Sequence, residues 1–174
     1  VTLVEKADRL MAGADRDLVG PLVERLKDLF EAIRLETSVK EIRELEGGVE
    51  VTLNGAAGSA PERFDRVLLA LGRRPDSSRL GLEHTKVGLD ERGFVMVNAQ
   101  CRTADERIYA VGDLVGGAML AHKAMFEGKV AAEVIAGKPS AFEPQAIPAV
   151  VYTNPQLAWC GLTEEEARRQ QRSV

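Results

Sequence analysis

The sequence has 174 residues, which suits one ordinary domain or two small ones, and its 45% hydrophobic and 29% charged residues are typical of globular proteins. A net charge of −4, from 23 Lys and Arg against 27 Asp and Glu, argues against nucleic-acid binding. No apolar run reaches the roughly 18 residues of a transmembrane helix, and two cysteines exclude a disulfide-stapled secreted scaffold.

The first third of the chain predicts a strand, a helix and a hairpin. Residues 1–4 are apolar and end at Glu5, which fits a buried strand with a carboxylate at its carboxyl end. Leucines spaced by three and four predict a helix over 15–30, and Pro21 should kink that helix or delay its start. Two alternating segments flank Gly47-Gly48 and predict a hairpin, followed by a loop over 54–63.

The remaining two thirds predict further strands around one long helix. Apolar runs predict strands over 67–71, 94–96, 107–113 and 147–153, of which the first and third should be buried on both faces. A helix is expected over 121–136, ended by Gly137. Thr163 and Glu166 form a capping box that opens a last helix. Because the chain opens inside a strand and closes just after a helix start, both ends look cut from a longer protein.

The most informative segment joins the 107–113 strand to the 121–136 helix. The strand ends in Gly112-Asp113, where open α/β sheets bind ligands. Backbone N–H groups at the helix start suit an electron-rich acceptor. Small residues along one helix stripe would let a flat ligand or another backbone approach: Ala121, Ala124, Gly128 and Ala131. A tightly packed turn without a ligand explains the same pattern, so both interpretations remain open.

Three motifs resemble the dihydrolipoamide dehydrogenases among the FAD-dependent pyridine nucleotide-disulfide oxidoreductases. They are Thr103 with the run 109–113, the Met-Leu-Ala-His-Lys-Ala run 119–124, and the run 147–155 with Ala158-Trp159 and Gly161. The resemblance covers essentially the whole chain. It implies an α/β fold: a partial FAD/NAD(P)-binding two-dinucleotide-domain fold with a β-meander, plus the first elements of the α+β dimerisation domain.

The resemblance also implies cofactor contacts. Asp113 would hydrogen-bond the ribityl chain of FAD, and Met119, Leu120, Ala121 and His122 would lie along the flavin, the last two through backbone N–H groups. Glu5 would accept hydrogen bonds from the adenosine ribose and repel a 2′-phosphate, which favours NAD over NADP. Val39 would pack on the adenine side and Gly72 would pass close to NAD.

Several features weaken or leave open parts of this assignment. Leu71 stands where the family has a small or hydroxyl residue, which is a departure from the family pattern beside the expected NAD contact at Gly72. Arg73-Arg74 fits a charged loop near the anionic cofactors and a solvated surface pair equally well. Glu5 and His122 each also suit an ordinary structural residue.

No catalytic residue and no metal site is expected in this chain. Cys101 and Cys160 do not match the family's redox disulfide, whose cysteines are separated by four residues, so both are expected to be reduced, buried and inert. The disulfide, the catalytic His-Glu pair and both glycine-rich phosphate loops would lie outside the printed sequence. We therefore expect a fragment without turnover.

The resemblance implies three partial domains. They are the later part of the NAD-binding domain (1–74), the returning segment of the FAD-binding domain (75–143) and the start of the interface domain (144–174). The parent enzyme would be a homodimer that serves lipoyl-bearing acyltransferase subunits of 2-oxoacid dehydrogenase complexes, with no nucleic acid or membrane partner. A bacterial cytoplasm is favoured over a mitochondrial matrix. Another flavoprotein disulfide reductase, of glutathione or mercuric reductase type, or a non-catalytic nucleotide-binding module remains an alternative.

Overall fold

The chain forms two compact units in the computed structural model, which describes residues 1–55, 58 and 60–173. The first unit comprises Val1–Ala70 and Val150–Val174, and the second comprises Leu71–Ala149. This grouping does not decide the domain division at residues 74 and 143, which stays a prediction.

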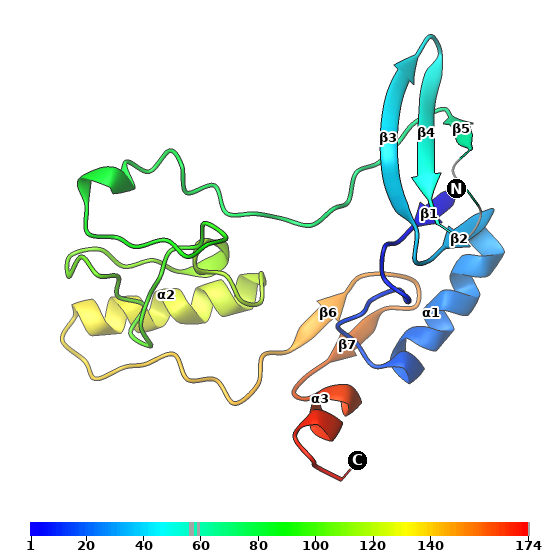
Figure 1. Ribbon diagram of the computed structural model, residues 1–174. Helices are drawn as coiled ribbons and strands as arrows, with labels where there is room; N and C mark the ends of the chain where they lie inside the picture. Colours follow the sequence, from blue (N-terminus) through cyan, green and yellow to red (C-terminus); the bar gives the residue numbers. More distant parts are fainter. Residues whose placement is uncertain (56–57, 59, 174) are drawn as a thin grey trace. The chain divides into compact units, whose positions relative to one another are not determined.

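The first unit begins with a strand, a helix and a parallel strand (Figure 1). Strand β1 (Thr2–Val4) pairs in parallel with β2 (Ala32–Arg34), and helix α1 (Arg16–Leu29) connects them. The strand at residues 1–4 and the first helix are thus confirmed, whereas β2 was not foreseen. Pro21 lies inside α1 without delaying its start at Arg16. Because β1 ends at Val4, Glu5 follows its carboxyl end as expected.

A three-stranded antiparallel meander follows β2. Strands β3 (Ser38–Leu45) and β4 (Gly48–Asn54) form the predicted hairpin, and β5 (Pro61–Phe64) pairs with β4. The predicted loop over 54–63 is therefore wrong at its end, because Pro61–Phe64 extends the sheet along β4. Residues 56, 57 and 59 of that loop lie outside the described residues.

The C-terminal segment supplies two short strands and a helix. Strand β6 (Ala149–Val151) pairs with β7 (Leu157–Trp159), and α3 (Glu164–Arg169) carries the predicted capping box at Thr163. The hydrophobic core of the first unit joins β7 to α1 and the loop before it through buried residues: Leu10, Ala14, Val19, Leu22 and Leu157. Packing of sequence-distant segments thus fixes this unit.

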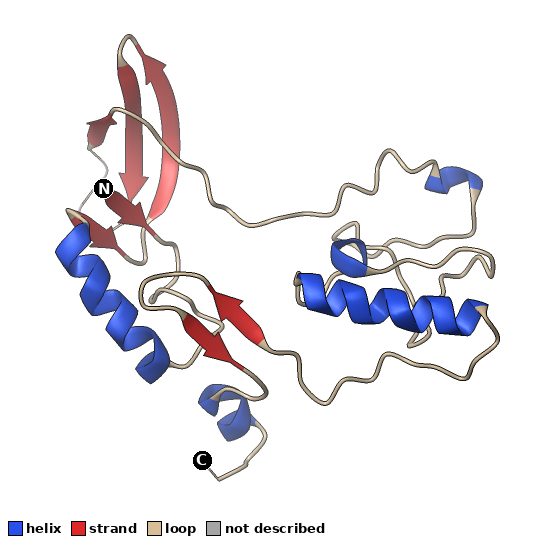
Figure 2. Ribbon diagram, turned by 180° about the vertical axis from the view of Figure 1, so that it is seen from behind, coloured by secondary structure: helices blue, strands red, loops and turns tan. Residues whose placement is uncertain are grey.

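The second unit is built around one long helix. Helix α2 (Ala121–Ile135) confirms the prediction for 121–136, and Figure 2 shows irregular segments surrounding it. Two short 3₁₀ helices, η1 (Leu82–His84) and η2 (Gly112–Val115), interrupt these segments. The core of this unit consists of Cys101 and three residues of α2, which are Val130, Ala131 and Val134.

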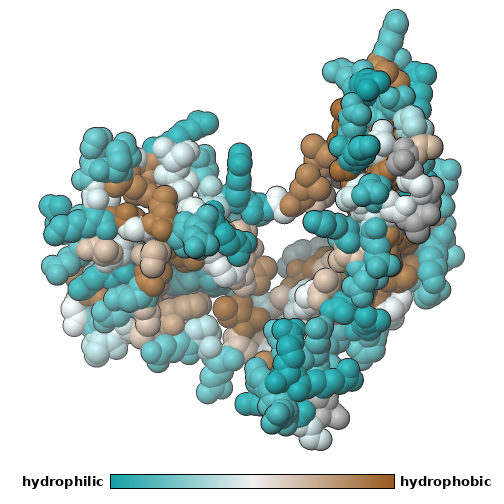
Figure 3. Space-filling view, viewed as in Figure 1, coloured by the Kyte–Doolittle hydropathy of each residue, from teal (hydrophilic) through white to brown (hydrophobic). Residues whose placement is uncertain are grey.

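Three predicted strands of this region do not form within the described residues. Residues 94–96 and 107–113 make only isolated bridges, Leu89 with Val95 and Arg102 with Tyr109. In the run 67–71, Leu68 is 90% exposed. A strand requires a hydrogen-bonded neighbour along several residues, and no described segment forms such a ladder with these runs. Apolar patches accordingly interrupt the hydrophilic surface of the molecule (Figure 3).

Candidate functional site

Asp113 lies in η2, directly after a glycine whose backbone conformation is decisive. Gly112 is buried and has φ +78°, a region that side-chain-bearing residues rarely adopt. A Cβ atom there would stand 3.2 Å from the Cβ of Ala124, so the absence of a side chain lets η2 lie directly on α2. The Asp113 side chain is 48% exposed, and its Oδ2 lies 3.8 Å from Nη1 of Arg73.

The start of α2 presents backbone donors. Leu120 is the N-cap and makes no side-chain capping hydrogen bond. No acceptor among the described residues takes the N–H groups of Ala121 and His122. The first N–H groups of a helix carry partial positive charge. This helix start can therefore receive an electron-rich ligand.

His122 uses its side chain within the chain. Its Nε2 lies 2.8 Å from the carbonyl oxygen of Pro148. A carbonyl oxygen only accepts hydrogen bonds, so this geometry assigns the proton to Nε2. The contact is compatible with a contribution to ligand binding through the backbone N–H of His122.

A hollow of about 230 Å³ joins several predicted residues of the second unit. It brings Asp113 and Met119 together with the Arg73-Arg74 pair, and Pro75, Asp76 and Leu114 complete its lining. Gly72 precedes the arginines with φ +94°, and no atom lies within 4 Å of its ideal Cβ position. The candidate FAD residues and Gly72 thus belong to one unit.

The other two candidate NAD residues, Glu5 and Val39, lie in the first unit. Glu5 Oε1 accepts a hydrogen bond from the Ala7 N–H at 2.7 Å. The Glu5 carbonyl oxygen accepts one from the Thr37 N–H at 3.0 Å, just before β3. Val39 in β3 is 43% exposed and pairs with Leu53. Exposure of Val39 leaves it available for contact with a planar ring.

Sequence reasoning missed a buried ion pair beside Gly112. Lys123 Nζ and Glu127 Oε1 lie 2.7 Å apart, and each side chain is only 5% exposed. Both residues belong to the buried row of α2 with Val130, Ala131 and Val134, where apolar side chains are the usual occupants. The signal was a Lys and a Glu four residues apart on that face.

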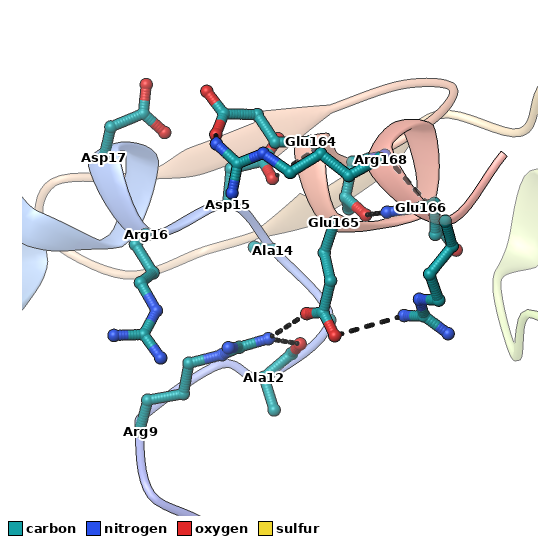
Figure 4. A pocket seen from close by; sticks show the side chains of 13 residues that line it. Arg9, Ala12, Ala14, Asp15, Arg16, Asp17, Glu164, Glu165, Glu166 and Arg168 are labelled. Atoms are coloured by element: carbon teal, nitrogen blue, oxygen red, sulfur yellow. Dashed lines mark hydrogen bonds and ion pairs between the residues drawn. The ribbon is translucent and has the colours of Figure 1, made fainter. Parts of the chain in front are cut away.

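The larger hollow, of about 710 Å³, belongs to the first unit and contains none of the predicted site residues (Figure 4). Five of its charged side chains form ion pairs with one another: Glu165 contacts Arg9 at 2.9 Å and Arg169 at 3.3 Å, and Glu164 contacts Arg168 at 2.7 Å. The hydrogen bond from Arg9 lowers the pKa of Glu165 and raises the pKa of Arg9. This hollow is lined by an ion-pair network between α3 and the loop before α1.

The two cysteines differ, which corrects the expectation that both are buried. Cys101 is buried and Cys160 is exposed, and both are free thiols. Burial raises the pKa of the Cys101 thiol, so that thiol is poorly reactive. Cys160 is exposed because it directly follows the short strand β7 at the surface.

Membrane-spanning helices and metal sites are two further features that the described residues could contain. None of their helices combines the length and the apolar character that a bilayer crossing requires. None of their His, Cys, Asp and Glu side chains gather in threes in a way that could hold a metal ion.

Comparison with known proteins places the fold. Residues 1–128 match the family described as pyridine nucleotide-disulphide oxidoreductase, and residues 147–174 match its dimerisation domain. In solved structures, the Cu(II) complex of the HOCl-induced flavoprotein disulfide reductase RclA from Escherichia coli has a TM-score of 0.86 and 28% identity. That match covers 97% of this chain and 39% of RclA. LpdA from Mycobacterium tuberculosis has a TM-score of 0.87 and 25% identity, over 98% of this chain and 37% of LpdA.

Curated relatives share more of the sequence. A dihydrolipoyl dehydrogenase of Vibrio cholerae is 45% identical over 97% of this chain and 35% of its own length. The dihydrolipoyl dehydrogenase of Haemophilus influenzae is 41% identical over 98% and 35%, respectively. The chain thus spans about a third of these relatives. It has the α/β fold of a partial FAD/NAD-binding domain with the start of a dimerisation domain, and it belongs to the pyridine nucleotide-disulphide oxidoreductase family.

Proposed function

We propose that this chain supplies part of the FAD and NAD sites of a dihydrolipoyl dehydrogenase. Such an enzyme oxidises dihydrolipoamide through a redox disulfide and FAD and reduces NAD. The observation that carries the proposal is the placement of the Asp113 carboxylate and the N–H groups at the start of α2 in one unit. Identity of 41–45% to dihydrolipoyl dehydrogenases favours this enzyme over the more distant reductase type.

The residues of the second unit suit FAD. The Asp113 carboxylate is half-exposed and can accept hydrogen bonds from ribityl hydroxyl groups. Met119 and Leu120 would lie along the flavin, and the N–H groups of Ala121 and His122 would face its pyrimidine edge. When bound, FAD supplies a two-electron carrier between thiols and nicotinamide. The chain's own contribution is to hold that carrier and to stabilise negative charge with the helix start.

The remaining candidates suit NAD. Glu5 Oε1 is engaged by the Ala7 N–H, so Oε2 is the oxygen for a ribose hydroxyl. A carboxylate at this position repels a 2′-phosphate, which makes NAD the preferred nucleotide over NADP. Val39 would contact the adenine, and the backbone at Gly72 would lie close to the nucleotide.

The chain as printed is proposed to lack turnover. Its two cysteines, at positions 101 and 160, lie too far apart in sequence for the family's Cys-x-x-x-x-Cys disulfide. In the complete enzyme we expect a homodimer in a bacterial cytoplasm, with lipoyl-bearing acyltransferase subunits as partners. The match of residues 147–174 to a dimerisation domain supports the dimer.

The test compares the 174-residue chain with the protein expressed from its complete coding sequence. We expect dihydrolipoamide-dependent NADH formation from the complete protein and none from the chain. NADH formation by the chain alone would disprove its inactivity. A coding sequence with neither an upstream Cys-x-x-x-x-Cys nor a downstream His-x-x-x-x-Glu would instead support a non-catalytic nucleotide-binding module.

A further inference from the structure

Lys123 and Glu127 contact both backbone polar groups of a single residue, Gly112. Glu127 Oε2 accepts a hydrogen bond from the Gly112 N–H at 2.7 Å, and Lys123 Nζ donates one to the Gly112 carbonyl oxygen at 3.4 Å. The two side chains contact each other at 2.7 Å through Glu127 Oε1. Gly112 is thus enclosed by an ion pair that is almost fully buried.

Core stability alone does not account for this arrangement. Desolvation of two charges offsets most of their attraction, and apolar residues of similar volume often stabilise a core at least as well. The distinctive effect of the pair is directional, because it fixes the donor and the acceptor of a glycine that otherwise has wide conformational freedom. Because Asp113 directly follows Gly112, the backbone conformation of Gly112 sets the position from which the Asp113 side chain extends.

The same pair connects the two parts of the candidate flavin site. Lys123 lies in the first turn of α2, where the N–H groups of Ala121 and His122 are available, and Asp113 directly follows Gly112. Fixing Gly112 to Lys123 and Glu127 therefore fixes the backbone from which the Asp113 side chain extends, relative to the helix start. Because Gly112 has no Cβ, which would lie only 3.2 Å from the Cβ of Ala124, the two backbones can come close enough for these bonds.

We propose that Lys123 and Glu127 are positioning residues, whose buried ion pair fixes Gly112 and thereby presents Asp113 to the ribityl chain of FAD. This inference rests on the proposed function, because it takes Asp113 as a flavin ligand. Neither side chain is assigned a contact with the cofactor. Their effect on FAD binding must therefore pass through Asp113.

Two double variants separate positioning from charge. Lys123→Met with Glu127→Gln removes both charges and keeps an oxygen acceptor for the Gly112 N–H. Lys123→Met with Glu127→Leu removes the charges and the acceptor together. Lys27→Met is the matched control, because Lys27 forms an exposed pair with Glu24 at the same 2.7 Å in α1. All variants are made in the protein expressed from its complete coding sequence.

The readouts are the FAD dissociation constant, from flavin fluorescence, and hydrogen exchange of the peptide that contains Gly112. We expect the Leu-containing double variant to bind FAD about tenfold more weakly and to lose protection at Gly112. Lys27→Met should bind FAD with wild-type affinity, and the Gln-containing double variant, which keeps an acceptor for the Gly112 N–H but lacks the Lys123 donor, should lose less affinity than the Leu-containing one. Adding Asp113→Ala to the Leu-containing variant should weaken binding by no more than about twofold beyond Asp113→Ala alone.

The remaining outcomes distinguish failure of the positioning role from failure of the proposed flavin site. Equal FAD affinity in the Leu-containing variant and the wild type overturns the positioning role. Equal losses in both double variants, multiplying with the loss from Asp113→Ala, also overturn it and assign the pair a purely structural role. Failure of the wild type to bind FAD, or an Asp113→Ala variant that binds as well as the wild type, overturns the proposed flavin site itself.

Discussion

The two units differ in the interactions that stabilise them: strand pairing in the first and packing around one helix in the second. In the first unit, strands pair with strands of the same unit, and its ion pairs lie at the surface or are half-buried, as with Arg9 and Glu165. In the second unit, no strand lies wholly among the described residues, and a charged pair is buried. A segment becomes a strand where its partner is present in the same unit, and elsewhere loops depend on a helix and its side chains for order.

The largest expected effect is in the second unit. Glu127→Leu alone leaves the Lys123 ammonium group buried without its carboxylate, which costs about 3–5 kcal/mol of unfolding free energy. Lys27→Met, in an exposed pair of the first unit, should change stability little. Urea unfolding followed by circular dichroism measures both. Similar small losses in the two variants would remove the contrast between buried and exposed pairs.

A core substitution tests the first unit. Leu157 in β7 is 1% exposed, so Leu157→Ala should cost about 2–5 kcal/mol. Trp159 is the single tryptophan and packs against the same core cluster, so its fluorescence reports this unfolding. Leu162→Ala is the control, because Leu162 is 46% exposed. A loss at Leu162 as large as that at Leu157 would contradict the assigned core.

A smaller effect is expected at the capping box of α3. Thr163 accepts a hydrogen bond from the Glu166 N–H at 3.2 Å, and Glu166 Oε2 accepts one from the Thr163 N–H at 2.9 Å. Thr163→Ala should cost about 1 kcal/mol, whereas Thr163→Ser keeps the hydroxyl and most of the stability. Hydrogen exchange at the Glu166 amide checks this, and unchanged protection in Thr163→Ala would argue against the cap.

The smallest effect concerns pH. The Arg9 hydrogen bond is the main cause of the lowered pKa of Glu165, so Arg9→Met should raise that pKa toward its ordinary value. A lowered folded-state pKa adds stability above the ordinary glutamate pKa, and that stability is lost as pH falls through the lowered value. NMR titration of the carboxyl groups measures the shift. Glu166 serves as the internal control, because its pKa is lowered mainly by the Thr163 backbone N–H.

Local signals in the sequence predicted elements whose stabilising contacts are local. The helices at 15–30 and 121–136, the Gly47-Gly48 hairpin and the Thr163 capping box are all confirmed. The apolar runs 67–71 and 107–113 were mistaken for strands, because hydrophobicity indicates burial but not the presence of a pairing partner. Strands β2, β5 and β7 were missed because each is only three or four residues long.

The candidate site could be predicted only in part. The structure brings Asp113, Met119 and the Arg73-Arg74 pair around one hollow, whereas the sequence left a solvated surface position equally open for the two arginines. The assigned cofactor roles of the site residues stay predictions. The Lys123–Glu127 pair was overlooked because charges four residues apart on a helix usually indicate a solvated face. Only its burial against Gly112 distinguishes it.

The unequal exposure of the two thiols makes Cys160 a site for selective labelling. A maleimide dye should attach to Cys160 at neutral pH and leave Cys101 unmodified, because Cys101 is buried and its pKa is raised. The dye would then be adjacent to Trp159 in the chain, with the indole as donor for energy transfer. A single labelled position can thus follow the first unit without any engineered cysteine.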